Sequence, residues 1–351
     1  MGVNKYLSVI NDNKFLRHFF ERLRYASFSK LINFIKAEIA LHDKRTSLPS
    51  YPYEAILDLN NYCNLKCPLC DTGMSLSKYP KGTMGLPLFS EICRQLSPYV
   101  FNISLYNYGE IFLVKQLEKY FRIARENRIG LTLSSNLSMH LSDETIENLI
   151  KYKINTLIIS CDGTTQEAYE KYRKKGDISI VFQSIKRISL LKKHLKSRFP
   201  TLVWQFLVMK HNKHEVEQAK SMFKRIGADK LEFGSIRIPF GIRDDNLVKT
   251  YFTEEQQQTI KSWHVLQSDM HVPCWWLWRA IVVNWDGTVV PCCILNCDDY
   301  GFGDFKTHSL EEIWNSKAYV AARKLSLGKN TQMDLICKQC DVIKAFPPYP
   351  N

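Results

Sequence analysis

Three cysteines, Cys63, Cys67 and Cys70, lie close together in a C-x3-C-x2-C spacing. They follow directly on a strand-like run at 54–60. Thiolates are the usual ligands of iron–sulfur clusters, so a loop this tight can hold three corners of a four-iron cubane. The fourth iron would then stay open to a bound small molecule. The alternatives are a zinc site, which is more often closed by four ligands, and a set of core thiols.

A second group of four cysteines lies near the end of the chain: Cys274, Cys292, Cys337 and Cys340. Cys292 follows a hairpin pattern in which Asp286-Gly287 separates two apolar runs, a pair that favours a tight turn. The C-x2-C pair at 337–340 follows a predicted helix that opens with a capping box at Ser309 and runs to Leu325. Four convergent ligands can hold zinc or a [4Fe–4S] cluster, and spacing alone does not separate them.

Composition limits the classes of protein that this chain can represent. Its 351 residues, 45% of them hydrophobic, predict two domains or one large domain with an appendage. No run of 18 apolar residues and no signal peptide is found, so we expect a cytoplasmic protein with metal or redox cysteines. The net charge of +13 is compatible with an anionic substrate, an acidic lipid surface, nucleic acid or simple solubility.

The chain divides into four predicted segments. Residues 1–50 are a basic, helical lead-in, and residues 51–245 form the main domain. A connector, residues 246–270, joins it to a small cysteine-bearing domain at 271–351. Within the lead-in, residues 13–42 carry apolar positions at helical spacing, interleaved with lysine and arginine. Three roles are open for these helices: docking on the main domain, binding a partner, or lying on a membrane surface. In the last case the protein would be peripheral to the inner membrane. Near Glu254 to Trp263 the connector has one predicted helix.

Strand-like and helical patterns alternate through the main domain. Predicted strands lie at 54–60, 101–107, 130–135, 156–162, 202–209 and 230–236, and predicted helices at 88–97, 114–127, 143–152, 165–174, 180–195 and 213–227. Six β-then-α units predict an α/β fold with a parallel sheet and helices outside it, too few for a closed eight-fold barrel. Ligands should gather at the carboxyl ends of these strands, where the first cysteine loop lies.

The Cys63 loop resembles that of the radical S-adenosylmethionine (SAM) enzymes. The resemblance implies a partial (β/α)6 TIM-like barrel and a [4Fe–4S] cluster on Cys63, Cys67 and Cys70. SAM would bind the fourth iron through its amino and carboxylate groups. One electron, from a flavodoxin- or ferredoxin-type donor, would then yield a 5′-deoxyadenosyl radical that abstracts hydrogen from a substrate. Leu69 stands where the family commonly has an aromatic residue, and an aliphatic side chain can also pack against adenine.

The resemblance also implies SAM contacts at the later strand ends. Tyr108-Gly109-Glu110 resembles the Gly-Gly-Glu motif whose backbone meets the SAM amino group, with Tyr108 in place of the first glycine. Arg173 resembles the arginine that pairs with the SAM carboxylate, a geometry that suits a guanidinium. Four further residues are candidates for the ribose or the substrate: Ser135, Asn136, Ser160 and Asp162. At the fifth strand, the candidates for contact with the cofactor or the substrate are Gln205, Lys210 and Asn212.

The last segment resembles the SPASM/twitch extension of radical SAM enzymes, in its single-cluster form. The pattern C-x17-C, a gap and C-x2-C is similar to that of 2-deoxy-scyllo-inosamine dehydrogenase. It implies one fully ligated auxiliary [4Fe–4S] cluster on Cys274, Cys292, Cys337 and Cys340, with Cys293 as an alternative to Cys292. The aromatic run 274–278 is interpreted as a small core under the cluster or as a wall for substrate.

Two outcomes for a substrate radical follow from this arrangement. The auxiliary cluster would accept an electron, giving oxidation, or a cysteine would donate a hydrogen atom, giving epimerisation. The candidate donors are Cys293, Cys161 and Cys297, whereas Cys93 lies on an apolar helix face as a core thiol.

A sugar, aminocyclitol or glycoconjugate substrate is the leading hypothesis, because no leader-peptide-binding segment is recognisable. The alternatives are a peptide maturase and a non-enzymatic metal-bearing protein that binds nucleic acid. Nucleic acid is not expected as a partner, because the basic residues are scattered.

Overall fold

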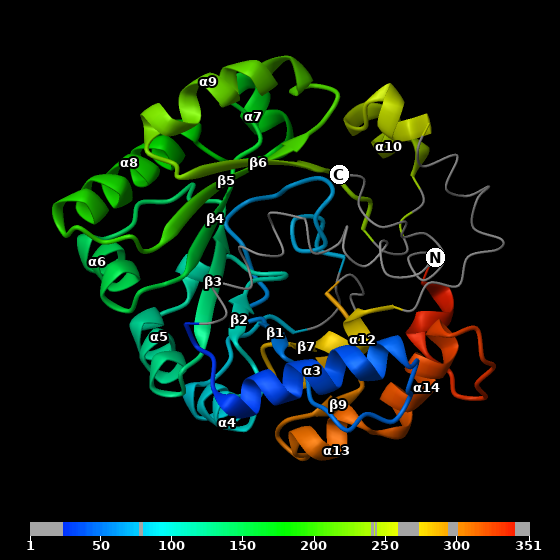
Figure 1. Ribbon diagram of the computed structural model, residues 1–351. Helices are drawn as coiled ribbons and strands as arrows, with labels where there is room; N and C mark the ends of the chain where they lie inside the picture. Colours follow the sequence, from blue (N-terminus) through cyan, green and yellow to red (C-terminus); the bar gives the residue numbers. More distant parts are fainter. Residues whose placement is uncertain are drawn as a thin grey trace, which may run out of the picture.

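The structure is a computed structural model that describes residues 24–76, 80–239, 242, 244–258, 274–293 and 301–340. Within these residues one curved sheet has the strand order β6-β5-β4-β3-β2-β1-β7-β8-β9 (Figure 1). The strands of the main domain are β1 (Glu54–Leu57), β2 (Asn102–Leu105), β3 (Gly130–Ser135), β4 (Thr156–Ser160), β5 (Thr201–Val208) and β6 (Lys230–Ser235). All six are parallel, which the βα alternation predicted.

Helices cover the convex side of this sheet, and the loop after β1 runs on its concave side (Figure 1). The helices and short 3-10 turns of this layer are α4 (Leu86–Leu96), η1 (Ile111–Leu113), α5 (Leu117–Glu126), α6 (Asp143–Lys151), α7 (Gln166–Tyr172), α8 (Ile178–His194), η2 (Lys213–Glu215) and α9 (Val216–Ile226). The predicted partial (β/α)6 barrel is therefore confirmed. The element boundaries differ from the predicted ones by a few residues, mostly at the strand ends.

The C-terminal hairpin belongs to the same sheet and is not a detached unit. Strand β7 (Ala280–Val283) pairs in parallel with β1, with Ala55 opposite Ile281. Strands β8 (Thr288–Val290) and β9 (Gly303–Asp304) continue antiparallel beyond it. The predicted turn is present, and Gly287 adopts the φ of 98° that such a turn demands. The second cysteine group is thus tied to the strand that leads into the first.

The helix predicted from Ser309 to Leu325 is two helices, α13 (Leu310–Trp314) and α14 (Lys317–Ser326). The capping box at Ser309 is confirmed. The break follows from Asn315, whose side chain accepts from Leu48 N at 2.9 Å and donates to Leu48 O at 3.0 Å. A second cap, Ser316, then restarts the helix.

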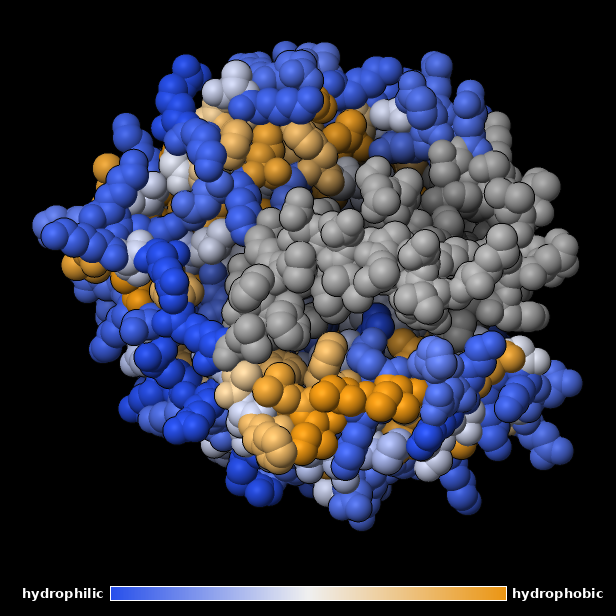
Figure 2. Space-filling model, in the orientation of Figure 1, coloured by the Kyte–Doolittle hydropathy of each residue, from blue (hydrophilic) through white to orange (hydrophobic). Residues whose placement is uncertain are grey.

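The lead-in contributes helix α3 (Phe28–His42), which Ser27 caps. Glu38 on α3 pairs with Arg279 at 2.6 Å, at the end of the short helix α12 (Trp276–Arg279). The opposite face exposes Phe28, Ile32, Ile35 and Ile39, and Figure 2 shows this apolar stripe where α3 lies in Figure 1. The predicted helical residues 13–23 lie outside the described residues. None of the described helices has the length and apolarity needed to cross a membrane.

The connector and the aromatic run contain short elements. Helix α10 (Asp245–Tyr251) was not predicted, and helical residues 254–258 begin the predicted helix near Glu254, whose remainder lies outside the described residues. In the aromatic run, Trp278 is fully buried, while Trp275 stacks on Trp276 and stays 41% exposed. The run therefore contributes both to the core and to the surface.

Arg323 on α14 holds the C-terminal helices to the rest of the chain. It is fully buried and donates to Leu277 O at 2.8 Å, Trp314 O at 2.8 Å and Thr46 O at 3.1 Å. These carbonyls come from three separate segments, so one side chain satisfies groups that water does not reach.

We therefore predict that Arg323→Met lowers the free energy of unfolding by about 3 to 5 kcal/mol, because several buried carbonyls lose a charged donor. Urea unfolding measures this. The matched control is Arg122→Met, whose side chain is 58% exposed beside Glu126 and whose loss should cost less than about 0.5 kcal/mol. Equal effects of the two substitutions would contradict the role given to Arg323.

Candidate functional site

The three-cysteine loop lies at the carboxyl end of β1. Cys67 is buried, and Cys63 and Cys70 are half-buried. Leu65 and Leu69 anchor the loop in a small apolar cluster that also contains Tyr172, Met209, Ile236 and Phe252. The next turn folds back over Cys67, where a Cβ on Gly73 would lie 2.4 Å from Cys67 O. Only glycine fits there, so the turn shape is fixed by close backbone packing.

Nitrogen donors surround the sulfur atoms of this loop. Leu65 N lies 3.4 Å and Asn136 Nδ2 lies 3.6 Å from Cys63 Sγ, and Arg173 Nη1 lies 4.0 Å from Cys67 Sγ. Burial raises the pKa of Cys63 to about 12 and that of Cys67 to about 11, the latter against the lowering effect of Arg173. Bound iron would displace these protons, and the nitrogen donors would stabilise the resulting thiolates. The donor set therefore fits a cluster.

Arg173 is held beside Cys67 by Asp162. Arg173 Nε donates to Asp162 Oδ2 at 2.6 Å, and Asp162, which is fully buried, also accepts from Leu207 N at 2.7 Å. The carboxylate is thus occupied by protein donors. Its function in this geometry is to orient the guanidinium, whose Nη1 points to the cysteine loop.

Glu110 ties the ends of β2 and β3 together. Its carboxylate accepts from Ser135 Oγ at 2.7 Å, Asn136 N at 2.9 Å and Phe112 N at 3.2 Å. Burial raises the pKa of Glu110, and the hydrogen bonds from Asn136 and Ser135 oppose this. The side chains of Glu110 and Ser135 are thereby engaged with each other, so the backbone around them is what a ligand would meet.

The preceding glycine permits a close approach of two strand ends. A Cβ on Gly109 would lie 2.0 Å from Asn60 Oδ1, and Asn60 Nδ2 donates to Glu110 O at 3.1 Å. Tyr108 donates its N–H to Asp58 Oδ1 at 3.0 Å, and its carbonyl accepts from Thr72. The segment 108–110 is therefore braced against β1 and the cysteine loop on both sides.

The other predicted site residues differ from one another in burial and in hydrogen-bond partners. Ser160 Oγ lies 3.4 Å from Ser134 Oγ, half-buried at the end of β4. Asn212 is buried and donates to Asp162 O and Leu207 O, so it supports the strand ends from within. Cys161 packs in the main core with no exposed surface, and its Sγ faces Gly163 O at 3.6 Å. This burial makes Cys161 a poor hydrogen donor to a substrate.

The second cysteine group lies at the ends of short elements: Cys274 precedes α12, Cys292 follows β8, and Cys337 and Cys340 lie in and directly after η3 (Ile336–Gln339). Cys292, Cys337 and Cys340 are buried, and Cys274 is half-buried. Burial and the nearby Cys340 raise the pKa of Cys274 to about 12. No three His, Cys, Asp or Glu side chains of the described part converge on one metal-ion position. The thiolates of a cubane bind separate irons and lie farther apart than the ligands of one ion.

Cys293 follows Cys292 of the auxiliary group and lies within electrostatic range of Cys274 and of Asp58 at the end of β1. It is half-buried and close enough to Cys274 to raise the pKa of that thiol. On the other side, the charge of Asp58 at the end of β1 raises the pKa of Cys293, while Arg237 lowers it. Cys297, the third predicted donor, lies outside the described residues.

Sequence reasoning missed Asp58, Asn60 and Arg237. The rule that polar residues gather at the ends of parallel strands would have found the first two, but the first strand was predicted to run through residue 60. It ends at Leu57. Arg237, two residues after β6, has no recognisable sequence signal.

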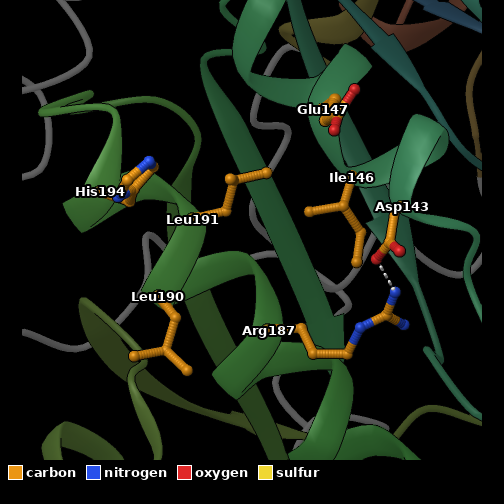
Figure 3. Close-up of a pocket in the computed structure, with 7 residues that line it drawn as sticks. All are labelled: Asp143, Ile146, Glu147, Arg187, Leu190, Leu191 and His194. Atoms are coloured by element: carbon orange, nitrogen blue, oxygen red, sulfur yellow. Dashed lines mark hydrogen bonds and ion pairs between the residues drawn. The ribbon is translucent and has the colours of Figure 1, made fainter.

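A pocket of about 430 Å³ opens elsewhere, on the convex side between α6 and α8 (Figure 3). An ion pair between Arg187 and Asp143 of 2.6 Å crosses it, among apolar side chains such as Leu190. It lies on the outer helical layer, away from the strand ends, and contains no cysteine.

Comparison with known proteins agrees with the class that the sheet and the two cysteine groups define, an iron–sulfur enzyme on a partial barrel. Residues 58–221 match the radical SAM superfamily, and residues 274–341 match SPASM, an iron–sulfur cluster-binding domain. The chain is a radical SAM enzyme with a C-terminal SPASM domain. Its cofactors are SAM and [4Fe–4S] clusters, an auxiliary cluster included. The non-enzymatic alternative is excluded.

Solved structures share the fold at low sequence identity. Streptococcus suis SuiB bound to precursor peptide SuiA matches with a TM-score of 0.62 and 14% identity, over 90% of this chain and 75% of that chain. Native anSMEcpe with bound AdoMet and Cp18Cys peptide matches with a TM-score of 0.58 and 18% identity, over 79% and 84%. BtrN in complex with AdoMet and 2-DOIA matches more distantly, with a TM-score of 0.46 and 16% identity, over 84% of this chain and 98% of that chain. No curated protein sequence matches the chain.

We predict that Arg173→Lys weakens SAM binding about tenfold, because an ammonium keeps the charge but loses the fork that suits a carboxylate. Equilibrium binding of SAM to the cluster-loaded protein measures this. The matched control is Arg187→Lys, which alters another Asp-paired arginine on the outer layer and should leave SAM affinity unchanged. Unchanged affinity in Arg173→Lys would remove this residue from the SAM site.

Proposed function

We propose that this enzyme abstracts hydrogen from a carbinol carbon of a sugar, aminocyclitol or glycoconjugate and oxidises or epimerises that carbon. The SAM-binding cluster and SAM together supply the 5′-deoxyadenosyl radical. Cys63, Cys67 and Cys70 hold that cluster. Cys274, Cys292, Cys337 and Cys340 hold the auxiliary one. An electron donor of the flavodoxin or ferredoxin type reduces the first cluster.

One observation carries this proposal: the Cys293 thiol lies within electrostatic range of Cys274 in the auxiliary group and of Asp58 at the strand end that leads into the SAM loop. A substrate radical formed near the SAM loop would therefore meet an electron acceptor or a thiol hydrogen donor from the same side. Oxidation uses the first and epimerisation the second.

The residues around SAM take the following proposed roles. Arg173 binds the SAM carboxylate, while Asp162 orients Arg173. The backbone of Tyr108, Gly109 and Glu110 binds the amino group, since the Glu110 side chain is held by Ser135 and the segment is fixed by Asn60 and Thr72. Ser160 and Asn136 offer polar atoms at neighbouring strand ends for the ribose, and Leu69 packs near adenine.

A peptide substrate is the second candidate. It is favoured by the match to SuiB bound to precursor peptide SuiA, which extends over 90% of this chain. At 14% identity that match shows a shared fold and does not identify the substrate of this chain.

The cluster assignment predicts about eight irons per chain, four in each cubane. Cys67→Ala should reduce this to about four and abolish 5′-deoxyadenosine formation from SAM and dithionite. Cys337→Ala should lose a similar amount of iron but still form 5′-deoxyadenosine. Cys93→Ala, which removes a fully buried thiol of the core under α4, is the control and should keep both. Product formation by Cys67→Ala would defeat the assignment.

The substrate class is tested with carbon-deuterated glucosamine and myo-inositol. Deuterium in 5′-deoxyadenosine, with a ketone or an epimer as the sugar product, is the expected result. Label transfer only from deuterated peptides would establish the peptide candidate instead.

We further propose that α3 binds an anionic lipid surface. The four apolar residues of its stripe include Phe28, which is 82% exposed, and Ile35, which is 55% exposed. Exposed cations flank the stripe at Arg24, Lys36 and Lys44, in a chain of net charge +13. Apolar burial together with attraction to acidic headgroups is what holds such helices at a membrane.

Co-sedimentation with phosphatidylcholine vesicles containing about 30% phosphatidylglycerol should therefore retain the protein more than pure phosphatidylcholine does. Ile35→Asp with Ile39→Asp should lower binding at least about tenfold, because two apolar side chains no longer enter the bilayer. Leu190→Asp with Leu195→Asp is the control, since these leucines are equally exposed, at 55% and 51%, on another face. Equal loss in both pairs would reject α3 as the contact.

A further inference from the structure

Helices α3, α5, α6 and α8 are each followed, after one capping residue, by an exposed cation in the left-handed backbone region. These cations are Lys44, Arg128, Lys153 and Lys196. Their φ angles lie between 49° and 55°. The next residue bonds back to the helix, as Ile129 N does to Ala124 O at 3.0 Å. This helix ending favours glycine, which has no Cβ to clash in the left-handed region.

Two other helices of this chain do end on glycine. Gly227 closes α9 with a φ of 103°, and Gly328 follows α14 with a φ of 74°. The four cations therefore occupy positions where glycine would be less strained. Their side chains are exposed, and they form no ion pair within the part of the chain that the structure describes. A partner outside the chain would explain why four separate helix ends carry them.

The segment that leads into α3 crosses three of these helix ends. Each of the three loops leads into β3, β4 or β5, so all lie at the amino ends of the strands. The contacts are Lys30 Nζ to Arg128 O at 2.8 Å, Tyr25 OH to Asn155 Oδ1 at 2.8 Å, and Arg24 at 4.1 Å over the Phe199 ring. The cations and α3 thus share one edge of the barrel, opposite the carboxyl ends that carry the cysteine loop.

The apolar stripe of α3 points away from this edge. The buried residues of α3, among them Asn33 and Ala37, face the strand ends. At 3.6 residues per turn, the stripe from Phe28 to Ile39 lies on the opposite side of the helix. Apolar side chains with cations around them complement a bilayer that has acidic headgroups. Nucleic acid would attract the cations but offers no apolar layer for the stripe.

We propose that the amino-end face, formed by the α3 stripe with Arg128, Lys153 and Lys196, docks on an anionic bilayer. The cysteine loop then faces water, on the side of the barrel away from the lipid. This rests on the proposed lipid contact of α3 and extends it to the loops before β3, β4 and β5. It also narrows the substrate, which enters from water and is not linked to a lipid.

The test is co-sedimentation of the full-length protein with phosphatidylcholine vesicles that contain about 30% phosphatidylglycerol. The variant combines Arg128→Gly, Lys153→Gly and Lys196→Gly, and leaves α3 unchanged. It should bind at least about tenfold more weakly, because three cations near the headgroups are lost. Its melting temperature should not fall, because glycine relieves the left-handed strain. A merely structural role of these residues would not give weaker binding without a loss of stability.

The matched control removes three exposed cations from the carboxyl end of the barrel. It combines Lys175→Gly, which is also left-handed with a φ of 70°, with Lys115→Gln and Lys213→Gln. This variant should bind vesicles like wild type. Equal loss in the two triple variants would show that only total charge matters and would overturn the orientation. Wild-type affinity in the glycine variant, or no binding by wild type, would overturn the face itself.

Activity on vesicles tests the orientation independently. Formation of 5′-deoxyadenosine from SAM and dithionite should proceed at the same rate on vesicles as in solution, whereas a fall would place lipid over the site and overturn the proposal. Retention on a DNA duplex but not on vesicles would also overturn it, in favour of nucleic acid. Failure of the α3 contact has a different signature: Ile35→Asp with Ile39→Asp binds like wild type, while the glycine variant does not.

Discussion

The parallel pairing of β1 with β7 is the contact on which the rest of this structure depends. Residues 54–57 and 280–283 are far apart in sequence but share one hydrogen-bonded ladder. The first strand leads into the three-cysteine loop, and the second links Cys274 to Cys292. Since the register of a buried strand is strongly specified, this one ladder fixes the relative positions of both cysteine groups. The hydrophobic core of the described residues is continuous across the two segments.

Around this ladder the polar groups fall into two kinds. Glu110, Asp162 and Asn212 are saturated by protein donors or acceptors and serve as braces for strand ends. Asp58 accepts from Tyr108 N on Oδ1, and within the described part of the chain its Oδ2 has no partner at hydrogen-bond distance. The contrast is informative because proteins rarely bury polar atoms without partners. In this enzyme the braces hold the strand ends that carry the candidate SAM contacts.

The sequence predicted the alternating strands and helices well, because βα units are local patterns with strong periodicity. It predicted both cysteine groups, since short spacings encode them directly. It did not predict that β7 joins β1, because a pairing across more than two hundred residues leaves no local signal. Nor did it predict the helix break at Asn315, which depends on a contact with distant Leu48. Side-chain roles such as the bracing by Asp162 needed the fold.

Helix α12 has a consequence of its own. It lies directly between Cys274 and β7, and its last residue, Arg279, pairs with Glu38 on α3. A molecule that binds α3 is therefore connected to Cys274 through the Glu38–Arg279 ion pair and helix α12. By thermodynamic reciprocity, if displacement of α3 by a surface alters the reduction potential of the auxiliary centre, then a change of its oxidation state alters adhesion to that surface by the same free energy.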